Sequence, residues 1–166
     1  MESDQIMFTS EQLIQELALI PHPEGGYFKE IHKASFQLNC DKTHGGARRV
    51  YSTIYYLLPG NDFSAWHKVA SDETWYFHAG CDLVLYSIDA NGHLIEQVLG
   101  TSQFCFQLTI KANTWFCAKP IDEHAYTLAS CSVAPGFEYD DFTLATEEEL
   151  MNLYPQHKKM IKAFIH

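Results

Sequence analysis

His67 and Glu73 are the first candidates for a catalytic or ligand-binding site. They lie six residues apart in the stretch FSAWHKVASDETWYFHAG, residues 63–80, which is otherwise mostly apolar and aromatic and ends at a glycine. An imidazole beside a carboxylate can act as a general base, because the carboxylate fixes the tautomer of the ring and favours its protonation. The alternative interpretation is a hydrogen-bonded pair that orders a strand junction, or the remnant of an older metal site.

Aromatic side chains accompany this pair. Trp75 and Phe77 follow Glu73 at a period of two residues, so in a strand all three side chains lie on one face. We expect Phe116 on the same inward face. Aromatic residues inside a small barrel are most often core, but beside a histidine and a glutamate they also suit the flat face of a sugar or base.

Arg49 is a further candidate for ligand binding. It lies just before the strand-like run VYSTIYYLL. A guanidinium that pointed inward could bind the phosphate or carboxylate of an anionic ligand. A solvated arginine at the end of a strand is the commoner outcome.

Most of the chain that must position these residues has the pattern of β-strands. Strand-length runs of aromatic and β-branched residues are separated by turn residues at 59–61, 90–92 and 111–113. The runs are RRVYSTIYYLL, DETWYFHAG, DLVLYSID, HLIEQVLG, FCFQLTI, NTWFCAK and AYTLASCSVAPGF. Successive strands without helices between them indicate an antiparallel barrel or sandwich.

Helices are predicted at both ends of this β-rich region. The stretch TSEQLIQELALI, residues 9–20, has apolar residues at helical spacing, and Thr9 with Gln12 matches a capping box. That helix should stop at Pro21. After residue 145, Thr146 is the expected cap of a short helix that ends near Tyr154, and a second helix follows.

Length, composition and charge limit the remaining choices. The chain has 166 residues, 46% of them hydrophobic, and no linker or repeat, so we expect one domain over 1–166, with a barrel at about 25–145 and C-terminal helices at 146–166. The formal net charge of -10 repels phosphate backbones and anionic lipids, which argues against nucleic acid as a partner.

The expected location is the cytoplasm. The N-terminus MESDQIMFTS is acidic, unlike a signal peptide, and no uncharged apolar run approaches the roughly 20 residues of a membrane-spanning helix. The five cysteines are odd in number and include no C-x-x-C pair, which is typical of reduced thiols. We therefore predict a soluble cytoplasmic protein without a membrane partner.

A family resemblance is carried by several stretches of the chain. His67, Glu73 and Gly80 look like the first cupin motif, and the surrounding segments resemble the uncharacterised branch of cupins called cupin-5. These segments are HPEGGYF (22–28), IYYLL (54–58), WHKVASDETWYFHAG (66–80) and VAPGFEYDDFTLA (133–145). The resemblance implies an all-β fold, the cupin double-stranded β-helix or jelly-roll barrel of the sugar-nucleotide epimerase-like (RmlC-like) cupins, with flanking helices.

The chain departs from the cupin pattern at the metal ligands. A metal-binding cupin has two histidines separated by one residue, a glutamate and a last histidine from a second motif. Here Val69 stands in place of the second histidine and Phe116 in place of the last. His67 and Glu73 alone would make only a weak divalent-metal site, since such metals need three or four protein ligands. We therefore expect no tightly bound cofactor.

These observations favour a cupin that binds a small polar or aromatic metabolite around His67 and Glu73. As an enzyme it would resemble an epimerase or isomerase, with His67 as base and Glu73 orienting it. The alternatives are a non-catalytic binding or storage-type module and a metal-dependent cupin with a degenerate site. Cupins of this type often form homodimers through N-terminal strands, for which GGYFKEIHKASF, residues 25–36, is the expected donor.

Overall fold

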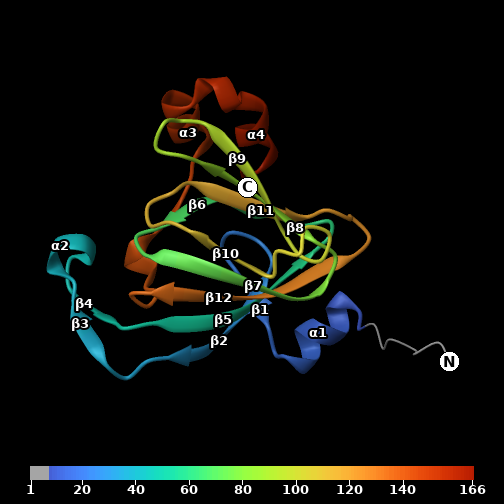
Figure 1. Cartoon of the computed structure of the whole chain (residues 1–166), viewed down its shortest axis with the longest axis horizontal. Coiled ribbons are helices and arrows are strands. Elements are labelled where there is room, and N and C mark those ends of the chain that lie inside the picture. The colour runs from blue at the N-terminus through green and yellow to red at the C-terminus, as the bar shows by residue number, and fades with distance from the viewer. Residues whose placement is uncertain (1–7) are drawn as a thin grey trace.

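Antiparallel sheets make up most of the chain (Figure 1). The computed structural model describes residues 8–166, whose thirteen strands form three sheets. The six-stranded sheet has the order β1 (Ile20–Pro21), β2 (Tyr27–Lys33), β5 (Ser52–Pro59), β12 (Tyr126–Ala134), β7 (Asp72–Gly80), β10 (Gln107–Ile110). The five-stranded sheet has the order β13 (Phe142–Leu144), β6 (Ser64–Val69), β11 (Phe116–Pro120), β8 (Leu83–Ile88), β9 (Leu94–Leu99). The prediction of an antiparallel, mostly β fold is confirmed.

The main core lies between the two large sheets. Strand β12 alternates buried and half-buried residues along most of its length, as expected for a strand with one face on the core. Its neighbour β7 alternates in the same way over its first residues, whereas β5 has three consecutive buried residues, 56–58. The enclosed cluster includes Tyr56, Trp75, Leu85 and Phe116. Two aromatic pairs in this cluster meet edge to face, Tyr56 with Trp75 at 5.3 Å and Trp75 with Phe116 at 6.2 Å between ring centroids.

Strands β6 and β7 are consecutive in the chain but belong to opposite sheets, and this places His67 across the interior from Glu73. The register pairs His67 with Phe116 and Leu144 in one sheet. In the other sheet, Glu73 lies opposite Ile110 and Val133. Each residue is therefore fixed by neighbours on both sides of its strand.

Gly80 ends β7 because no larger residue fits there. Its φ is +93°, and a Cβ atom would lie 2.0 Å from the carbonyl oxygen of Tyr126. Both features require glycine. The glycine that the sequence places at the end of this segment therefore allows β12 to pack closely against the end of β7.

The C-terminal helices cover the outer face of the five-stranded sheet, at the top of Figure 1. They are α3 (Glu147–Leu153), the 3-10 turn η2 (Pro155–His157) and α4 (Lys158–Ala163). Leu150, Ile161 and Phe164 pack with Trp66 in a second apolar cluster. The Thr146 hydroxyl accepts a hydrogen bond from the Glu149 amide at 3.1 Å, which confirms the predicted cap.

The N-terminal helix is shorter than predicted. Helix α1 (Ser10–Glu16) has the expected capping box of Thr9 and Gln12. It does not continue to Pro21, because Ala18 adopts a left-handed conformation with φ of 52°. Ile20 and Pro21 then form β1, and the Ile20 side chain is 58% exposed instead of lying on the apolar face of a helix.

A small arm projects from the barrel at the left of Figure 1. It consists of β3 (Gln37–Asn39), α2 (Asp41–His44) and β4 (Ala47–Arg49). Arg48 joins this arm to the 3-10 turn η1 (Tyr139–Asp141) by two hydrogen bonds to Asp141, at 2.7 and 2.9 Å. No helix within residues 8–166 is long and apolar enough to cross a membrane.

Candidate functional site

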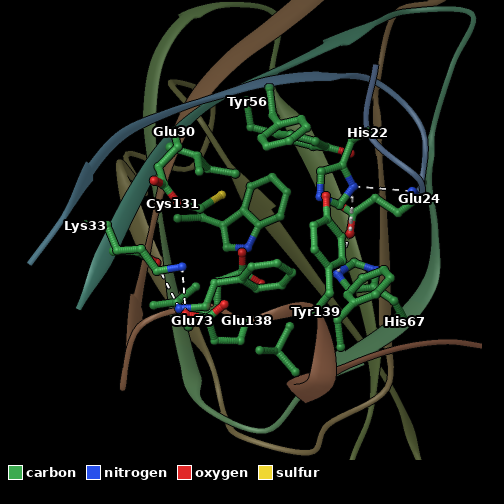
Figure 2. Close-up of a pocket in the computed structure, with 18 residues that line it drawn as sticks. His22, Glu24, Glu30, Lys33, Tyr56, His67, Glu73, Cys131, Glu138 and Tyr139 are labelled. Carbon is green, nitrogen blue, oxygen red and sulfur yellow. Dashed lines mark hydrogen bonds and ion pairs between the residues drawn. The ribbon is translucent and has the colours of Figure 1, made fainter. Parts of the chain in front are cut away.

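A cavity of about 120 Å³ opens inside the barrel, and Figure 2 shows the residues around it. Strands β2, β5, β7 and β12 of the six-stranded sheet form one side, and His67 and Val69 of β6 form part of the other. Most of the wall is aromatic or aliphatic. The lining aromatic residues other than histidine are Phe28, Tyr56, Trp75, Phe137, Tyr139 and Phe142.

His67 is held by a carboxylate, but this carboxylate is that of Glu24. His67 Nδ1 lies 2.7 Å from the Ala65 carbonyl oxygen, and Nε2 lies 3.2 Å from Glu24 Oε2. A carbonyl only accepts, so Nδ1 carries a hydrogen. Nε2 then faces a carboxyl oxygen, and a favourable contact between them requires one further proton, shared by His67 and Glu24. The pair is a buried proton-holding unit on the cavity wall.

Glu24 is itself fixed by several contacts. Its Oε1 accepts a hydrogen bond from the Ser64 hydroxyl at 2.9 Å, and its backbone carbonyl accepts one from the Ala65 amide at 2.7 Å. His22 Nδ1 lies 3.6 Å from Oε2. Burial lowers the pKa of His22, with a smaller opposing effect from the charge of Glu24.

The turn between β1 and β2 brings Glu24 to His67. Gly25 and Gly26 have φ of 111° and 66°, and their tight turn carries Glu24 into the barrel. The sequence motif HPEGGYF contained this signal. A predicted turn does not indicate which side chains it buries, so the motif alone does not identify Glu24 and His22 as residues of the cavity.

Glu73 lies at another part of the cavity and is not bonded to His67. Its Oε2 is buried, and no hydrogen-bond partner for it occurs among residues 8–166. The same holds for the indole Nε1 of Trp75, two residues further along β7. Burial raises the pKa of Glu73 to about 8, and the charge of Glu24 adds to the shift. The nearby Cys131 thiol and Trp75 indole oppose it weakly, since neither contact with the carboxyl group has the geometry of a hydrogen bond. Glu73 is therefore mostly a neutral acid at pH 7.

The mouth of the cavity is closed by an ion pair. Lys33 on β2 and Glu138, just before η1, lie 2.8 Å apart, with side chains 28% and 43% exposed (Figure 2). Tyr139 follows from η1, and the Arg48 contact with Asp141 anchors this turn. The segment VAPGFEYDDFTLA thus supplies the rim of the cavity.

The structure brings together three of the residues predicted for the site. His67, Glu73 and Trp75 all line the cavity. Phe116 does not line the cavity but packs against His67, with 4.1 Å between their ring centroids. Phe77 is on the predicted face but further along β7, where it packs against the main core and does not line the cavity.

Two expected roles need correction. Arg49 does not point into the cavity, because its guanidinium donates a hydrogen bond to the Ser35 carbonyl oxygen. Glu73 does not orient His67, because Glu24 occupies that position.

The chain belongs to the cupin superfamily. The family model described as "Cupin superfamily (DUF985)" matches residues 11–145. A hypothetical protein from Leishmania major has the same fold with a TM-score of 0.88 and 34% identity, covering 96% of this chain and 99% of that one. A protein structure from Shewanella oneidensis has a TM-score of 0.87 and 31% sequence identity, again covering 96% of this chain and 99% of that one.

Two further comparisons add a curated relative and a distant neighbour. An uncharacterized protein of Saccharomyces cerevisiae is 29% identical over 178 residues, which cover 93% of this chain and 85% of that protein. Oxalate decarboxylase from Bacillus subtilis has a TM-score of 0.52 at 11% identity, covering 80% of this chain and 40% of that one. This last likeness concerns the fold alone.

The residues of the cavity do not fit the metal that the cupin fold often holds. Within residues 8–166, no group of three or more His, Cys, Asp or Glu side chains is arranged to bind a metal ion. Val69 and Phe116 offer no ligand atoms, and the outer nitrogen of His67 faces Glu24. His78 and His124 do not supply the missing ligands, because His78 bonds to Ser130 and His124 is exposed, and neither lines the cavity.

The shifted acid predicts an unusual pH dependence of stability. In the unfolded chain Glu73 ionises near pH 4.5, whereas in the folded protein it keeps its proton until about pH 8. Because the folded state binds more protons between these values, the free energy of unfolding falls as the pH rises through this window. We expect the free energy of unfolding of the wild type to fall relative to that of Glu73→Gln, by up to about 5 kcal/mol between pH 4.5 and pH 8, as measured by chemical unfolding.

Asp72→Asn is the matched control for this comparison. Lys111 and the Ala112 amide lower the pKa of Asp72, so that residue titrates below the window. The difference in the free energy of unfolding between Asp72→Asn and the wild type should therefore not change between about pH 5 and pH 8. Parallel pH profiles for the wild type and Glu73→Gln would show that Glu73 is not a shifted acid.

Proposed function

We propose that this protein binds a small molecule in the barrel cavity. The observation that supports the proposal is the pair of buried polar atoms that have no partner among residues 8–166, Glu73 Oε2 and Trp75 Nε1, beside the aromatic residues of the cavity wall. A buried donor or acceptor left unpaired costs about 1 to 3 kcal/mol. Native proteins keep few such groups, and a bound ligand that pairs with both would remove the cost.

The size of the cavity limits the ligand. Its volume of about 120 Å³ is close to that of an engineered apolar cavity of about 150 Å³ that binds benzene. The buried part of the ligand is therefore a single ring or a chain of similar size. Aromatic walls suit a flat molecule, in agreement with the expected polar or aromatic metabolite.

A proton-transfer enzyme is the second candidate, and the pair of His67 and Glu24 favours it. Both ring nitrogens of His67 are engaged, so in this candidate the Glu24 carboxylate takes the proton from the ligand, and His67, which holds the shared proton, is the positioning residue. Glu73, which carries its own proton at neutral pH, is the complementary acid. An epimerase or isomerase needs such a pair of opposite protonation states. The non-catalytic binding module needs only the cavity, and the poor metal ligand set disfavours a metal-dependent reaction.

Trp75→Phe tests the binding function, since it removes the indole N–H and keeps an aromatic ring. Purified protein is equilibrated with a deproteinised extract of small metabolites, and the retained compounds are measured by mass spectrometry. We expect at least one small compound to be retained, with affinity reduced about three- to tenfold in Trp75→Phe, as for one lost hydrogen bond.

Trp115→Phe is the matched control. Trp115 is also a buried tryptophan, but it packs in the second cluster and does not line the cavity. It should retain the same compounds as the wild type. Equal retention by all three proteins, or none by any, would contradict a ligand role for the cavity.

We also propose that the protein forms a homodimer through the region of β2. Strand β1 pairs only with Tyr27 and Phe28, so within residues 8–166 the outer edge of β2 beyond them has no strand partner. Exposed apolar side chains continue along the same region: Ile31 at 48%, Phe36 at 66% and Leu38 at 44%. A bulge at Ile31 interrupts the regular edge, so side-chain burial rather than a continuous strand ladder supports the contact.

Phe36→Asp tests the dimer by placing a charge in this apolar region. Light scattering at micromolar concentration should show a dimer for the wild type and a monomer for Phe36→Asp. Phe104→Asp is the control, because Phe104 is 85% exposed but lies in the loop between β9 and β10. It should remain dimeric. A monomeric wild type, or equal dissociation of both variants, would contradict the proposal.

A further inference from the structure

The polar groups around the cavity define what kind of ligand it can hold, if the proposed binding function is correct. Trp75 Nε1 is a donor without an acceptor among residues 8–166, and Glu73 Oε2 is a carboxyl oxygen without a partner there. Both side chains project from one face of β7, two residues apart. A ligand that pairs with both offers an acceptor to the Trp75 indole N–H and a donor to the carboxyl oxygen of Glu73, because a carboxyl oxygen without the proton only accepts.

Among residues 8–166, no unpaired lysine or arginine lines the cavity to neutralise a negative charge. Its titratable lining groups are Glu24, Glu30, Glu73, Glu138, Lys33, His22 and His67, together with the weakly acidic Tyr56, Tyr139 and Cys131. The one lysine is already paired with Glu138 at the mouth. The arginines are engaged elsewhere, Arg48 with Asp141 and Arg49 with the Ser35 carbonyl. An anion would lose its hydration and meet the carboxyl groups of Glu24 and Glu73.

A cation is also a poor match, for a different reason. It could pair with an ionised Glu73, but an ammonium group has no acceptor for Trp75 Nε1, which would remain buried and unpaired. Burial keeps the proton on Glu73 up to about pH 8, so the free protein presents a neutral carboxyl group that both donates and accepts.

We infer that the cavity selects an uncharged, ring-sized ligand with a hydrogen-bond donor beside an acceptor, as in a cyclic amide or a hydroxy-carbonyl compound, and that it rejects anions. The acceptor of the ligand pairs with the indole N–H of Trp75, and its donor pairs with the carboxyl group of Glu73. Oxalate, the substrate named for the distant fold neighbours, carries two negative charges and is therefore excluded.

The test uses ring-sized probes that differ mainly in their polar groups. They are 2-pyridone, a cyclic amide with adjacent N–H and C=O; N-methyl-2-pyridone, which lacks the donor; benzoate, an anion; and benzylamine, a cation. Dissociation constants are measured by NMR titration at pH 7. We expect 2-pyridone to bind in the low millimolar range, as befits a fragment of this size, and the other three to bind about tenfold more weakly.

Two variants separate hydrogen bonding from packing at Glu73. Glu73→Gln keeps a donor and an acceptor and should bind 2-pyridone within about threefold of the wild type, whereas Glu73→Leu keeps the volume and should lose about tenfold. If benzoate or benzylamine binds as tightly as 2-pyridone, or if Glu73→Leu binds 2-pyridone as the wild type does, the selectivity is wrong although the cavity binds ligands. If no probe binds at about 20 mM, both the selectivity and the binding function fail.

Discussion

The burial of one carboxyl group, that of Glu73, is the constraint on which the account of this protein depends. The side chain projects from a strand that is paired on both sides, with β12 and with β10. The backbone at Glu73 is therefore fixed within the six-stranded sheet. Because burial disfavours the charged form, the group stays neutral until about pH 8, and one of its oxygens has no partner in the part of the chain that the structure describes. Such an arrangement lowers stability and is typical of functional sites.

A second acid in the same cavity has a different environment. Glu24 contacts His67 and accepts a hydrogen bond from Ser64, so its charge is compensated locally. The charge of Glu24 is also one of the causes that raise the pKa of Glu73. The cavity therefore combines a proton-holding pair at one side with a neutral acid at another. The same arrangement serves recognition of an uncharged ligand and, in the second candidate function, transfer of a proton.

The sequence predicts the barrel better than it predicts the site. Alternating apolar residues identify strands such as β7 and β12, and hydrogen-bonding residues at Thr9 and Thr146 mark the helix starts. The end of α1 is not predicted, because Ala18 takes a left-handed conformation that favours glycine.

Within the site, strand periodicity predicts which face of the sheet a side chain lies on, but not whether that part of the strand borders the cavity. Glu73, Trp75 and Phe77 share a face, yet only the first two reach the cavity. Glu24 is missed for another reason, since it comes from a turn far from His67 in the chain. Only the three-dimensional path of β1 and β2 brings the two together.

The most direct measurement is the titration of Glu73 in the ligand-free protein by NMR of its carboxyl carbon, with the signal assigned by its absence from Glu73→Gln. We predict a midpoint near pH 8, which moves downward in Glu24→Gln because the neighbouring negative charge is removed. A midpoint near the ordinary glutamate value of about 4.5, unchanged in Glu24→Gln, would contradict a buried neutral acid at this position.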